Sequence, residues 1–220
     1  MSSFTLKIIG IITMLLDHIG FVFYSPSFLR VIGRIAFPIF AFQAVIGYEH
    51  TKDKKKHLLK LFIFGLISQI PFSLMHIISK SALALNVMFT IFLGLLAISI
   101  FNEFEKKIDG FIAVILVGIL GLFLRVDYGF FGIMAIFLFY YFRNNKTKAA
   151  ISFSILFLIR YLLYIIYMDT LYYIFILLAT ISALIPISLY NKKEGIKTKY
   201  LFYVFYPLHM LIICLIYLFF

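Results

Sequence analysis

Residues 6–24 read LKIIGIITMLLDHIGFVFY, an apolar run whose polar interruptions are Lys7, Thr13 and the pair Asp17-His18. An α-helix rises 1.5 Å per residue, so about 20 such residues cross the hydrocarbon core of a bilayer. The run is longer than the apolar region of a signal peptide, and no Ala-x-Ala-like cleavage site follows it. We therefore predict a membrane-spanning helix at this position.

The composition extends this prediction to the rest of the chain. Apolar residues make up 64% and charged residues 13%, whereas soluble domains contain about 45–50% and 25%. One core in a chain of this size cannot hide so much hydrocarbon from water. The counts of 12 Gly, 5 Pro and 1 Cys also exclude a collagen, a disordered chain and a disulfide scaffold. The single cysteine, Cys214, cannot form an internal bridge.

The hydropathy pattern predicts nine such segments and no soluble domain. We expect an all-α polytopic membrane protein, a bundle of about nine transmembrane helices that forms a single integral-membrane domain over residues 1–220. The fifth and sixth segments are short, as in broken, re-entrant or less tilted helices. The predicted spans are 6–24, 28–48, 58–78, 83–101, 111–124, 128–142, 149–167, 171–189 and 200–220.

Most basic residues lie in loops on one side of these spans. Loops rich in Lys and Arg stay cytoplasmic, so we expect a cytoplasmic N-terminus, an outer C-terminus and a multi-pass location in the cytoplasmic (inner) membrane. The net charge of +11 then reflects topology. Nucleic acid is not an expected partner, because no basic domain with interleaved aromatics exists to bind it. The loop residues are Lys7, Lys52, Lys54, Lys55, Lys56, Lys60, Lys106, Lys107, Arg143, Lys146, Lys148, Lys192, Lys193, Lys197 and Lys199.

Polar side chains inside the predicted spans are the main indication of a site. An ionisable group at membrane depth costs a few kcal/mol on insertion scales, so it marks function by default. Counting residues at 1.5 Å each places Asp17, His18, Gln69 and Arg160 at similar depth, with Arg34 about 9 Å below the outer end of its helix. We expect these residues to converge on a cavity that opens outward, and we expect no metal site.

Each of these residues also has a structural interpretation, which the sequence leaves open. Asp17 beside His18 fits an ion pair or an interhelical hydrogen bond, and Arg30 fits a side chain that reaches the outer interface. The remaining structural interpretations are a salt bridge of Arg160 to Asp127 or Asp169, a kink at Gln69 and Pro71, a helix start or packing contact at Asn86 and Thr90, a kink with a locally bonded His209, a solvated loop at Lys52–Lys60, and close helix packing at Gly118 and Gly121.

One spacing suggests a donor site. Lys7 and His18 are 11 positions apart, which is three helical turns plus about 20°, so they share a face at a separation of about 16.5 Å. This arrangement suits a donor that enters from the cytoplasm, with its anionic part at Lys7 and its reactive end near His18.

Several motifs, in order over most of the chain, resemble the TraX family. The first two are the most specific. They are Leu6-Lys7-Ile8-Ile9-Gly10 through Met14-Leu15-Leu16-Asp17-His18-Ile19-Gly20, and Leu29-Arg30-Val31-Ile32-Gly33-Arg34-Ile35-Ala36-Phe37-Pro38-Ile39-Phe40-Ala41-Phe42 with Gly47-Tyr48. The others are Ser68-Gln69-Ile70-Pro71-Phe72, Leu85-Asn86-Val87-Met88-Phe89-Thr90 and Phe205-Tyr206-Pro207-Leu208-His209.

This resemblance implies an enzyme. The namesake of the family is associated with N-acetylation of conjugative pilin, and the family is similar to integral-membrane acyltransferases that acylate cell-surface glycans. Those enzymes carry a basic residue and a histidine separated by ten residues in the first helix, which Lys7 and His18 match, with Lys in place of the usual Arg. The implied reaction moves an acetyl or other acyl group from cytoplasmic acyl-CoA to an outward-facing protein amine, glycan or lipid head group.

The residue types are compatible with that reaction. His18 suits a general base or a nucleophile, Asp17 suits a group that orients it, and Arg34 suits an oxyanion stabiliser. The expected substrate-binding residues are Arg30, Gln69, Asn86, Arg160 and His209, and the expected residues for acyl-CoA are Lys7, Lys54, Lys55 and Lys56.

Three classes of function therefore stay open. The first is an acyl-CoA-dependent acyltransferase in the lipid bilayer, with self-association left open. The second is a proton-coupled transporter or flippase for an anionic lipid or metabolite, which the deep Asp-His pair and arginines also suit. The third is a non-catalytic membrane assembly factor, in which the charges only hold helices together.

Overall fold

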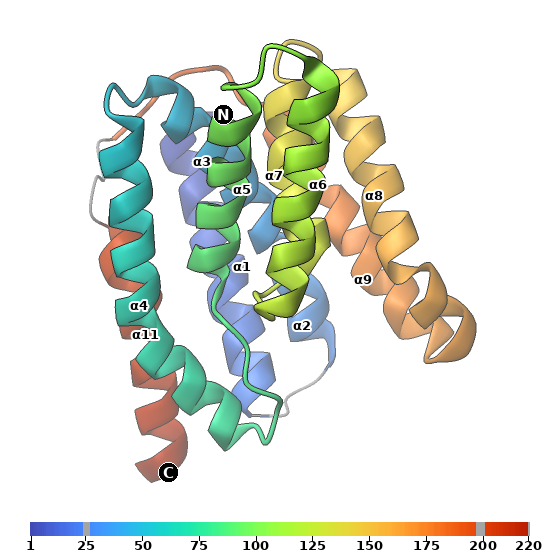
Figure 1. Ribbon diagram of the computed structural model, residues 1–220. Helices are drawn as coiled ribbons and strands as arrows, with labels where there is room; N and C mark the ends of the chain where they lie inside the picture. Colours follow the sequence, from blue (N-terminus) through green and yellow to red (C-terminus); the bar gives the residue numbers. More distant parts are fainter. Residues whose placement is uncertain (24–26, 197–200, 220) are drawn as a thin grey trace. The chain divides into compact units, whose positions relative to one another are not determined.

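The computed structural model describes residues 1–23, 27–196 and 201–219, without the side chains of Ser27 and Leu201. These residues are helical almost throughout, as Figure 1 shows, so the all-α prediction is confirmed. They contain no strand, only an isolated bridge between Leu85 and Val126. The helices are α1 (Ser3–Val22), α2 (Ser27–Gly33), α3 (Ala36–His50), α4 (Lys54–Ile78), α5 (Val87–Phe101), α6 (Lys107–Phe123), α7 (Gly129–Tyr141), α8 (Lys146–Tyr167), α9 (Thr170–Ser182), α10 (Leu184–Ser188) and α11 (Leu201–Phe219).

Two of the predicted spans are not the continuous helices that we expected. The segment 28–48 is interrupted at Arg34 and Ile35, between α2 and α3, and the segment 171–189 is interrupted at Ala183, between α9 and α10. A proline follows each break: Pro38 lies four residues after Arg34, and Pro186 lies four residues after Ser182. Proline has no N–H for the carbonyl four residues earlier and its ring clashes with that carbonyl, which ends a helix there.

Within the described part of the chain, six helical segments are long and apolar enough to cross a bilayer, if α2–α3 and α9–α10 each count as one. They are 3–22, 28–50, 54–78, 146–167, 170–188 and 202–219. The helices α5 and α7, at 15 and 13 residues, are shorter. The predicted span ends at 24, 200 and 220, and also Lys197 and Lys199, lie outside the described residues.

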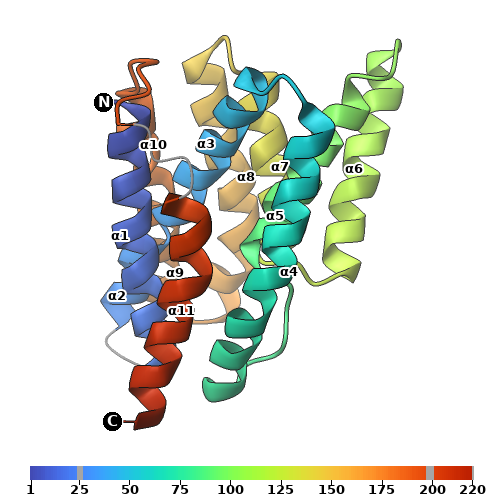
Figure 2. The ribbon, with the colours of Figure 1, turned by 90° about the vertical axis from the view of Figure 1, so that its left-hand side faces the viewer.

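The described residues form two compact units, and the first consists of 1–43, 70–83 and 157–220. In this unit α1 packs against α2 and, as Figure 2 shows, lies beside α11. The start of α1 is capped by Ser2, whose hydroxyl accepts from the backbone N–H of Thr5 at 3.2 Å. The backbone N–H of Ser3 donates to the carbonyl of Lys193 at 2.8 Å, which ties the start of the chain to the loop before α11.

The second unit consists of 44–69 and 84–156, and α5, α6 and α7 pack together in it. The predicted close packing at Gly118 and Gly121 is confirmed. A Cβ atom on Gly118 would lie 2.7 Å from the ring of Phe130, and one on Gly121 would meet the side chain of Ile133. The single membrane domain over the whole chain stays a prediction.

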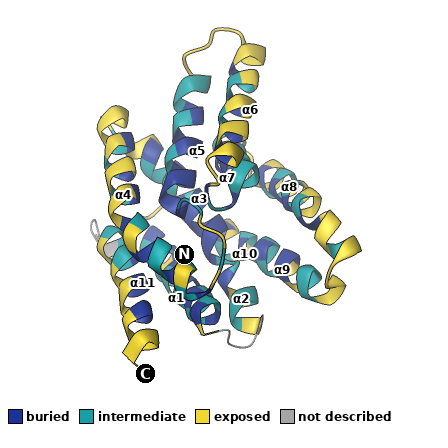
Figure 3. Ribbon diagram, turned by 60° about the horizontal axis from the view of Figure 1, so that its bottom comes forward, coloured by how far each residue is buried: buried dark blue, intermediate teal, exposed yellow. Residues whose placement is uncertain are grey.

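Apolar side chains cover the outside of several helices. Figure 3 shows exposed residues along α6 and α8. Many large apolar side chains are exposed there, such as Leu116 on α6, at 59%, and Leu163 on α8, at 64%. A protein surrounded by water on all sides rarely exposes apolar surface of this extent. Such faces suit lipid, and the chain is therefore a multi-pass membrane protein.

Candidate functional site

The polar site of the first unit forms where α1 and α2 come close together. Small residues allow this approach: a Cβ atom on Gly20 of α1 would lie 3.0 Å from Leu29, and one on Gly33 of α2 would overlap the side chain of Asp17. Small residues at helix contacts let backbones approach closely in membranes. The close approach brings Asp17 within reach of the arginines that follow it in the chain.

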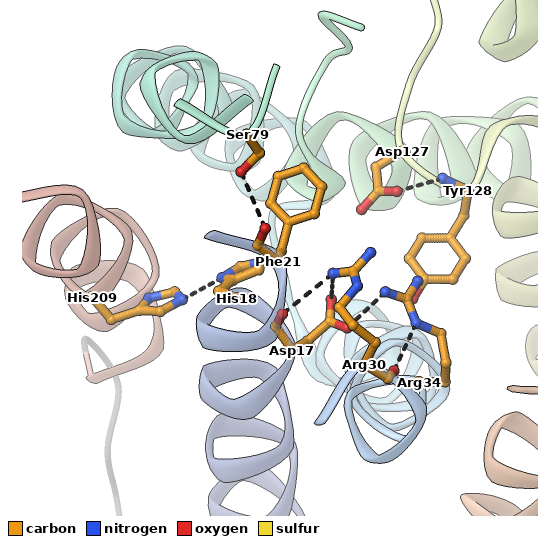
Figure 4. Close-up of polar contacts among 9 residues, drawn as sticks. All are labelled: Asp17, His18, Phe21, Arg30, Arg34, Ser79, Asp127, Tyr128 and His209. Atoms are coloured by element: carbon orange, nitrogen blue, oxygen red, sulfur yellow. Dashed lines mark hydrogen bonds and ion pairs between the residues drawn. The ribbon is translucent and has the colours of Figure 1, made fainter. Parts of the chain in front are cut away.

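Asp17 forms ion pairs with two arginines. One carboxylate oxygen lies 2.9 Å from Nη1 of Arg30, and the other lies 2.7 Å from Nη2 of Arg34 (Figure 4). The side chains of Asp17 and Arg34 are 14% and 15% exposed, so these are largely buried ion pairs. The guanidinium of Arg30 also lies 4.8 Å from the ring centre of Phe21, within cation–π distance. Arg30 thus contacts Asp17 and Phe21 within the protein and does not simply extend to the outer membrane–water interface.

His18 pairs with a histidine that is 191 positions away. Its Nδ1 lies 2.7 Å from Nε2 of His209 on α11, and the two side chains are buried, at 9% and 4% exposed. Nδ1 of His209 in turn lies 2.7 Å from the backbone carbonyl of Phe205, one helical turn earlier. The locally bonded His209 that we considered is therefore present, together with a second bond that the sequence does not show.

The neighbours Asp17 and His18 face different helices. Asp17 faces α2 and His18 faces α11, as Figure 4 shows, because consecutive helical positions are about 100° apart. The interpretation of the two as one ion pair was wrong, and the interpretation as interhelical contacts holds for each separately. His209, rather than Asp17, is the group that contacts Nδ1 of His18.

Gln69 and Asn86 lie in the second unit and bind each other. The Asn86 amide donates to the Gln69 carbonyl oxygen at 2.9 Å and to the carbonyl of Gly65 at 2.8 Å. Asn86 also caps α5, since its side chain accepts from the backbone N–H of Met88 at 3.0 Å. The amide of Gln69 donates to the carbonyl of Ala84 at 2.8 Å. These contacts agree with the interpretation of Asn86 as a helix start.

Asn86→Ala is expected to lower the free energy of unfolding by about 2 kcal/mol, because it removes a helix cap and leaves the carbonyl of Gly65 without its buried donor. Unfolding in detergent with increasing SDS, followed by pulse proteolysis, measures the change. Asn144→Ala is the matched control, since Asn144 is exposed in a turn. Equal stability of the two variants would contradict the structural role of Asn86.

The other predicted site residues lie elsewhere on the helices. Lys7 is half-buried on α1, on the same helix as His18 as expected. Arg160 is half-buried on α8, with its guanidinium carbon 5.7 Å from the ring centre of Tyr161. In the second unit, the exposed Lys54, Lys55 and Lys56 begin α4, so the loop expected over Lys52–Lys60 is wrong from Lys54 onward. The hydroxyl of Thr90 there donates to the carbonyl of Asp127, which is a packing contact.

Sequence reasoning missed the groups that surround the histidine pair. The ring of Phe205 lies parallel to that of His209, with centres 4.6 Å apart, and Tyr206, 1% exposed, has its ring centre 6.5 Å from that of His18. The spacing of Phe205 and His209, at i and i+4 on one helix, is a signal that was available. Among the described residues no group of three or more His, Cys, Asp or Glu gathers in a way that would hold a metal ion.

The helices and the polar site together define the class of protein. It is an all-helical, multi-pass membrane protein with a largely buried carboxylate–arginine cluster and a buried histidine pair. A family model described as TraX protein matches residues 2–217. The chain belongs to the TraX family, as the motifs of the sequence indicated.

Two relatives extend this finding. A protein of Dichelobacter nodosus named "Probable fimbrial assembly protein FimC, serogroup H1" is 27% identical over 239 aligned positions, which cover 97% of this chain and 94% of the relative. An uncharacterized protein of Rickettsia prowazekii (strain Madrid E) is 39% identical over 90 positions, 40% of this chain and 33% of that protein. No solved structure shows a significant match.

Proposed function

We propose that this protein is a membrane factor for the assembly of a fimbrial surface fibre. The observation that supports this proposal is the similarity to the Dichelobacter nodosus protein, whose name describes fimbrial assembly. The alignment covers almost the whole of both chains, so it is not a shared local motif. The comparison favours the assembly factor over the acyltransferase.

We propose in addition that the protein lies in the cytoplasmic membrane with its N-terminus inside and its C-terminus outside, through nine spans. The basic residues between α3 and α4 and in the first turn of α4 support this orientation, because Lys52, Lys54, Lys55 and Lys56 are all exposed and positively charged segments beside the spans stay cytoplasmic. An odd number of spans leaves the two ends of the chain on opposite sides.

The histidine pair favours a second candidate, acyl transfer to a fibre subunit. Two buried histidines in contact inside a membrane protein mark a functional site by default, and His18 is one of the two residues that match the acyltransferase pattern. In this candidate acyl-CoA is the donor, and Lys7, on the same helix as His18, is its phosphate contact. Modification of the fibre subunit is one way in which an assembly factor acts. Only a chemical analysis of the subunit therefore distinguishes the two candidates.

Deletion of the gene in the native cell is expected to remove surface fibres, while the fibre subunit stays detectable in the membrane fraction. Electron microscopy counts the fibres, and immunoblots of sheared and membrane fractions follow the subunit. Intact-mass spectrometry of the subunit, before and after deletion, then separates the two candidates. An unchanged mass supports a non-catalytic assembly factor, and loss of the mass of one acyl group supports the acyltransferase.

Re-expression of the wild-type protein is the control for the deletion, and it should restore the fibres. Re-expression of the exposed-residue variant Glu105→Gln should restore them equally. Fibres of normal number and length in the deletion strain would exclude the assembly role. Flux of an anionic metabolite that collapses with the proton gradient would then support the transporter.

A further inference from the structure

The two imidazole rings of His18 and His209 lie edge to edge. Their facing nitrogens are 2.7 Å apart, whereas the ring centres are 4.9 Å apart and the ring planes differ by only 9°. Rings stacked face to face could not bring two nitrogens to hydrogen-bond distance with the hydrogen in a ring plane. The contact is therefore an in-plane hydrogen bond, for which one nitrogen carries the proton and the other a lone pair.

The neighbouring carbonyl decides which nitrogen is which. Nδ1 of His209 lies 2.7 Å from the carbonyl oxygen of Phe205, and a carbonyl oxygen can only accept a hydrogen bond. Nδ1 of His209 therefore carries a proton. In a neutral His209 the other nitrogen, Nε2, then has the lone pair, and it accepts the bond from Nδ1 of His18.

The same reasoning applies to His18, the next group in the chain of hydrogen bonds. Because Nδ1 of His18 donates to His209, a neutral His18 has its lone pair on Nε2. A charge on either ring at this burial, 9% and 4% exposed, is costly in a membrane, so both rings are neutral. The order of groups is the Phe205 carbonyl, His209 and His18, and it ends at the basic Nε2 of His18.

Asp17 is not available for this role, although it is adjacent in sequence. Each of its carboxylate oxygens already pairs with an arginine, Arg30 or Arg34, on the side of α1 that faces α2. In the hydrolase triads an aspartate fixes the tautomer of the catalytic histidine and stabilises its protonated form. Here a neutral histidine occupies the corresponding place, and its lone pair strengthens the bond once His18 is protonated.

We propose that His209 is the positioning residue of His18: it holds His18 as the Nδ1–H tautomer, so that Nε2 is the basic nitrogen of the site. The tautomer of His18 does not depend on the proposed function. Its role as a base rests on the second candidate function, acyl transfer. There, Nε2 takes the proton of an acceptor N–H or O–H as that atom bonds to the acyl carbon. The C–S bond of the acyl thioester breaks, its electron pair leaves with the sulfur, and the thiolate takes the proton from Nε2.

The test is ¹⁵N NMR of the imidazole nitrogens in the full-length protein, labelled with ¹⁵N-histidine and held in lipid nanodiscs at neutral pH. Protonated and unprotonated ring nitrogens have separate chemical shifts, and couplings to the ring hydrogens tell Nδ1 from Nε2. We expect the Nδ1–H tautomer for both His18 and His209. His50 is the internal reference, because its Nδ1 also lies near a carbonyl, that of Ile46, at 2.8 Å.

Two variants at position 209 form a matched pair. His209→Phe keeps an aromatic ring but has no lone pair, so the signal of His18 is expected to leave the Nδ1–H position while that of His50 stays. His209→Gln provides a side-chain carbonyl that can accept the bond, so His18 is expected to keep the Nδ1–H tautomer. A wild-type His18 that is protonated on Nε2, or one that His209→Phe leaves unchanged, overturns the proposal.

The mass of the fibre subunit supplies the functional readout. If the wild type acylates the subunit, His209→Phe should reduce the acylated fraction per unit time by about 100-fold or more, and His209→Gln should restore most of it. Normal acylation in His209→Phe overturns the positioning role and leaves the acyltransferase intact. A wild-type subunit without an acyl group removes the acyltransferase candidate, and the NMR spectra still decide the tautomer.

Discussion

Asp17→Ala is expected to lower the free energy of unfolding by about 3–5 kcal/mol, because removal of one partner of a buried ion pair leaves the other charge uncompensated. Here one carboxylate serves two guanidiniums, at 2.9 Å from Arg30 and 2.7 Å from Arg34. Both arginines are less than a third exposed, at 26% and 15%, so water screens them little. The substitution leaves two positive charges close together beside α1.

The measurement is an SDS titration of the purified protein in detergent, followed by pulse proteolysis, since the chain has no Trp to report unfolding by fluorescence. Glu105→Gln is the matched control, because it removes one exposed negative charge and should change stability by less than about 0.5 kcal/mol. Replacing Asp17, Arg30 and Arg34 together by leucine should recover much of the loss, because no unpaired charge then remains. An Asp17→Ala protein as stable as Glu105→Gln would refute the importance of these ion pairs.

Gly33→Ala is the second large effect that we expect, a loss of about 1–3 kcal/mol of stability from overpacking. A Cβ atom at this position would overlap both the Cβ and the carboxylate of Asp17, so α2 must move away from α1 to admit a methyl group. That movement also lengthens the ion pairs of Asp17, and any function that depends on the cluster should fall with stability.

Gly47→Ala provides the opposite case on the next helix. Nothing lies within 4 Å of a Cβ atom at Gly47, which is inside α3. Alanine is the better helix former, by about 0.8–1.0 kcal/mol in model helices, so this variant should be as stable as the wild type or more stable. The same SDS titration compares the two substitutions. If both changed stability in the same direction and by the same amount, the close contact at Gly33 would have no energetic weight.

The positions of the helices along the chain could be predicted from hydropathy. In lipid every backbone N–H and C=O must bond within its own segment, so long apolar runs have to be helices. Pro38 and Pro186 explain the breaks at Arg34 and Ala183. Proline alone did not predict them, because Pro71 and Pro207 lie inside the unbroken helices α4 and α11. A helix start at Asn86 was one interpretation of the sequence, and in the structure Asn86 caps α5.

Which polar side chains meet depends on how the helices pack, and the sequence did not reveal it. Asp17 and His18 are adjacent, yet one pairs with the arginines beside α2 and the other with His209, which is 191 positions away on α11. The depth of a residue along a helix follows from counting residues. The partner that its side chain contacts depends on how the helices pack. The close approach at Gly33, and the packing of α1 against α11, are therefore what turned a set of costly polar residues into an ion-pair cluster and a histidine pair.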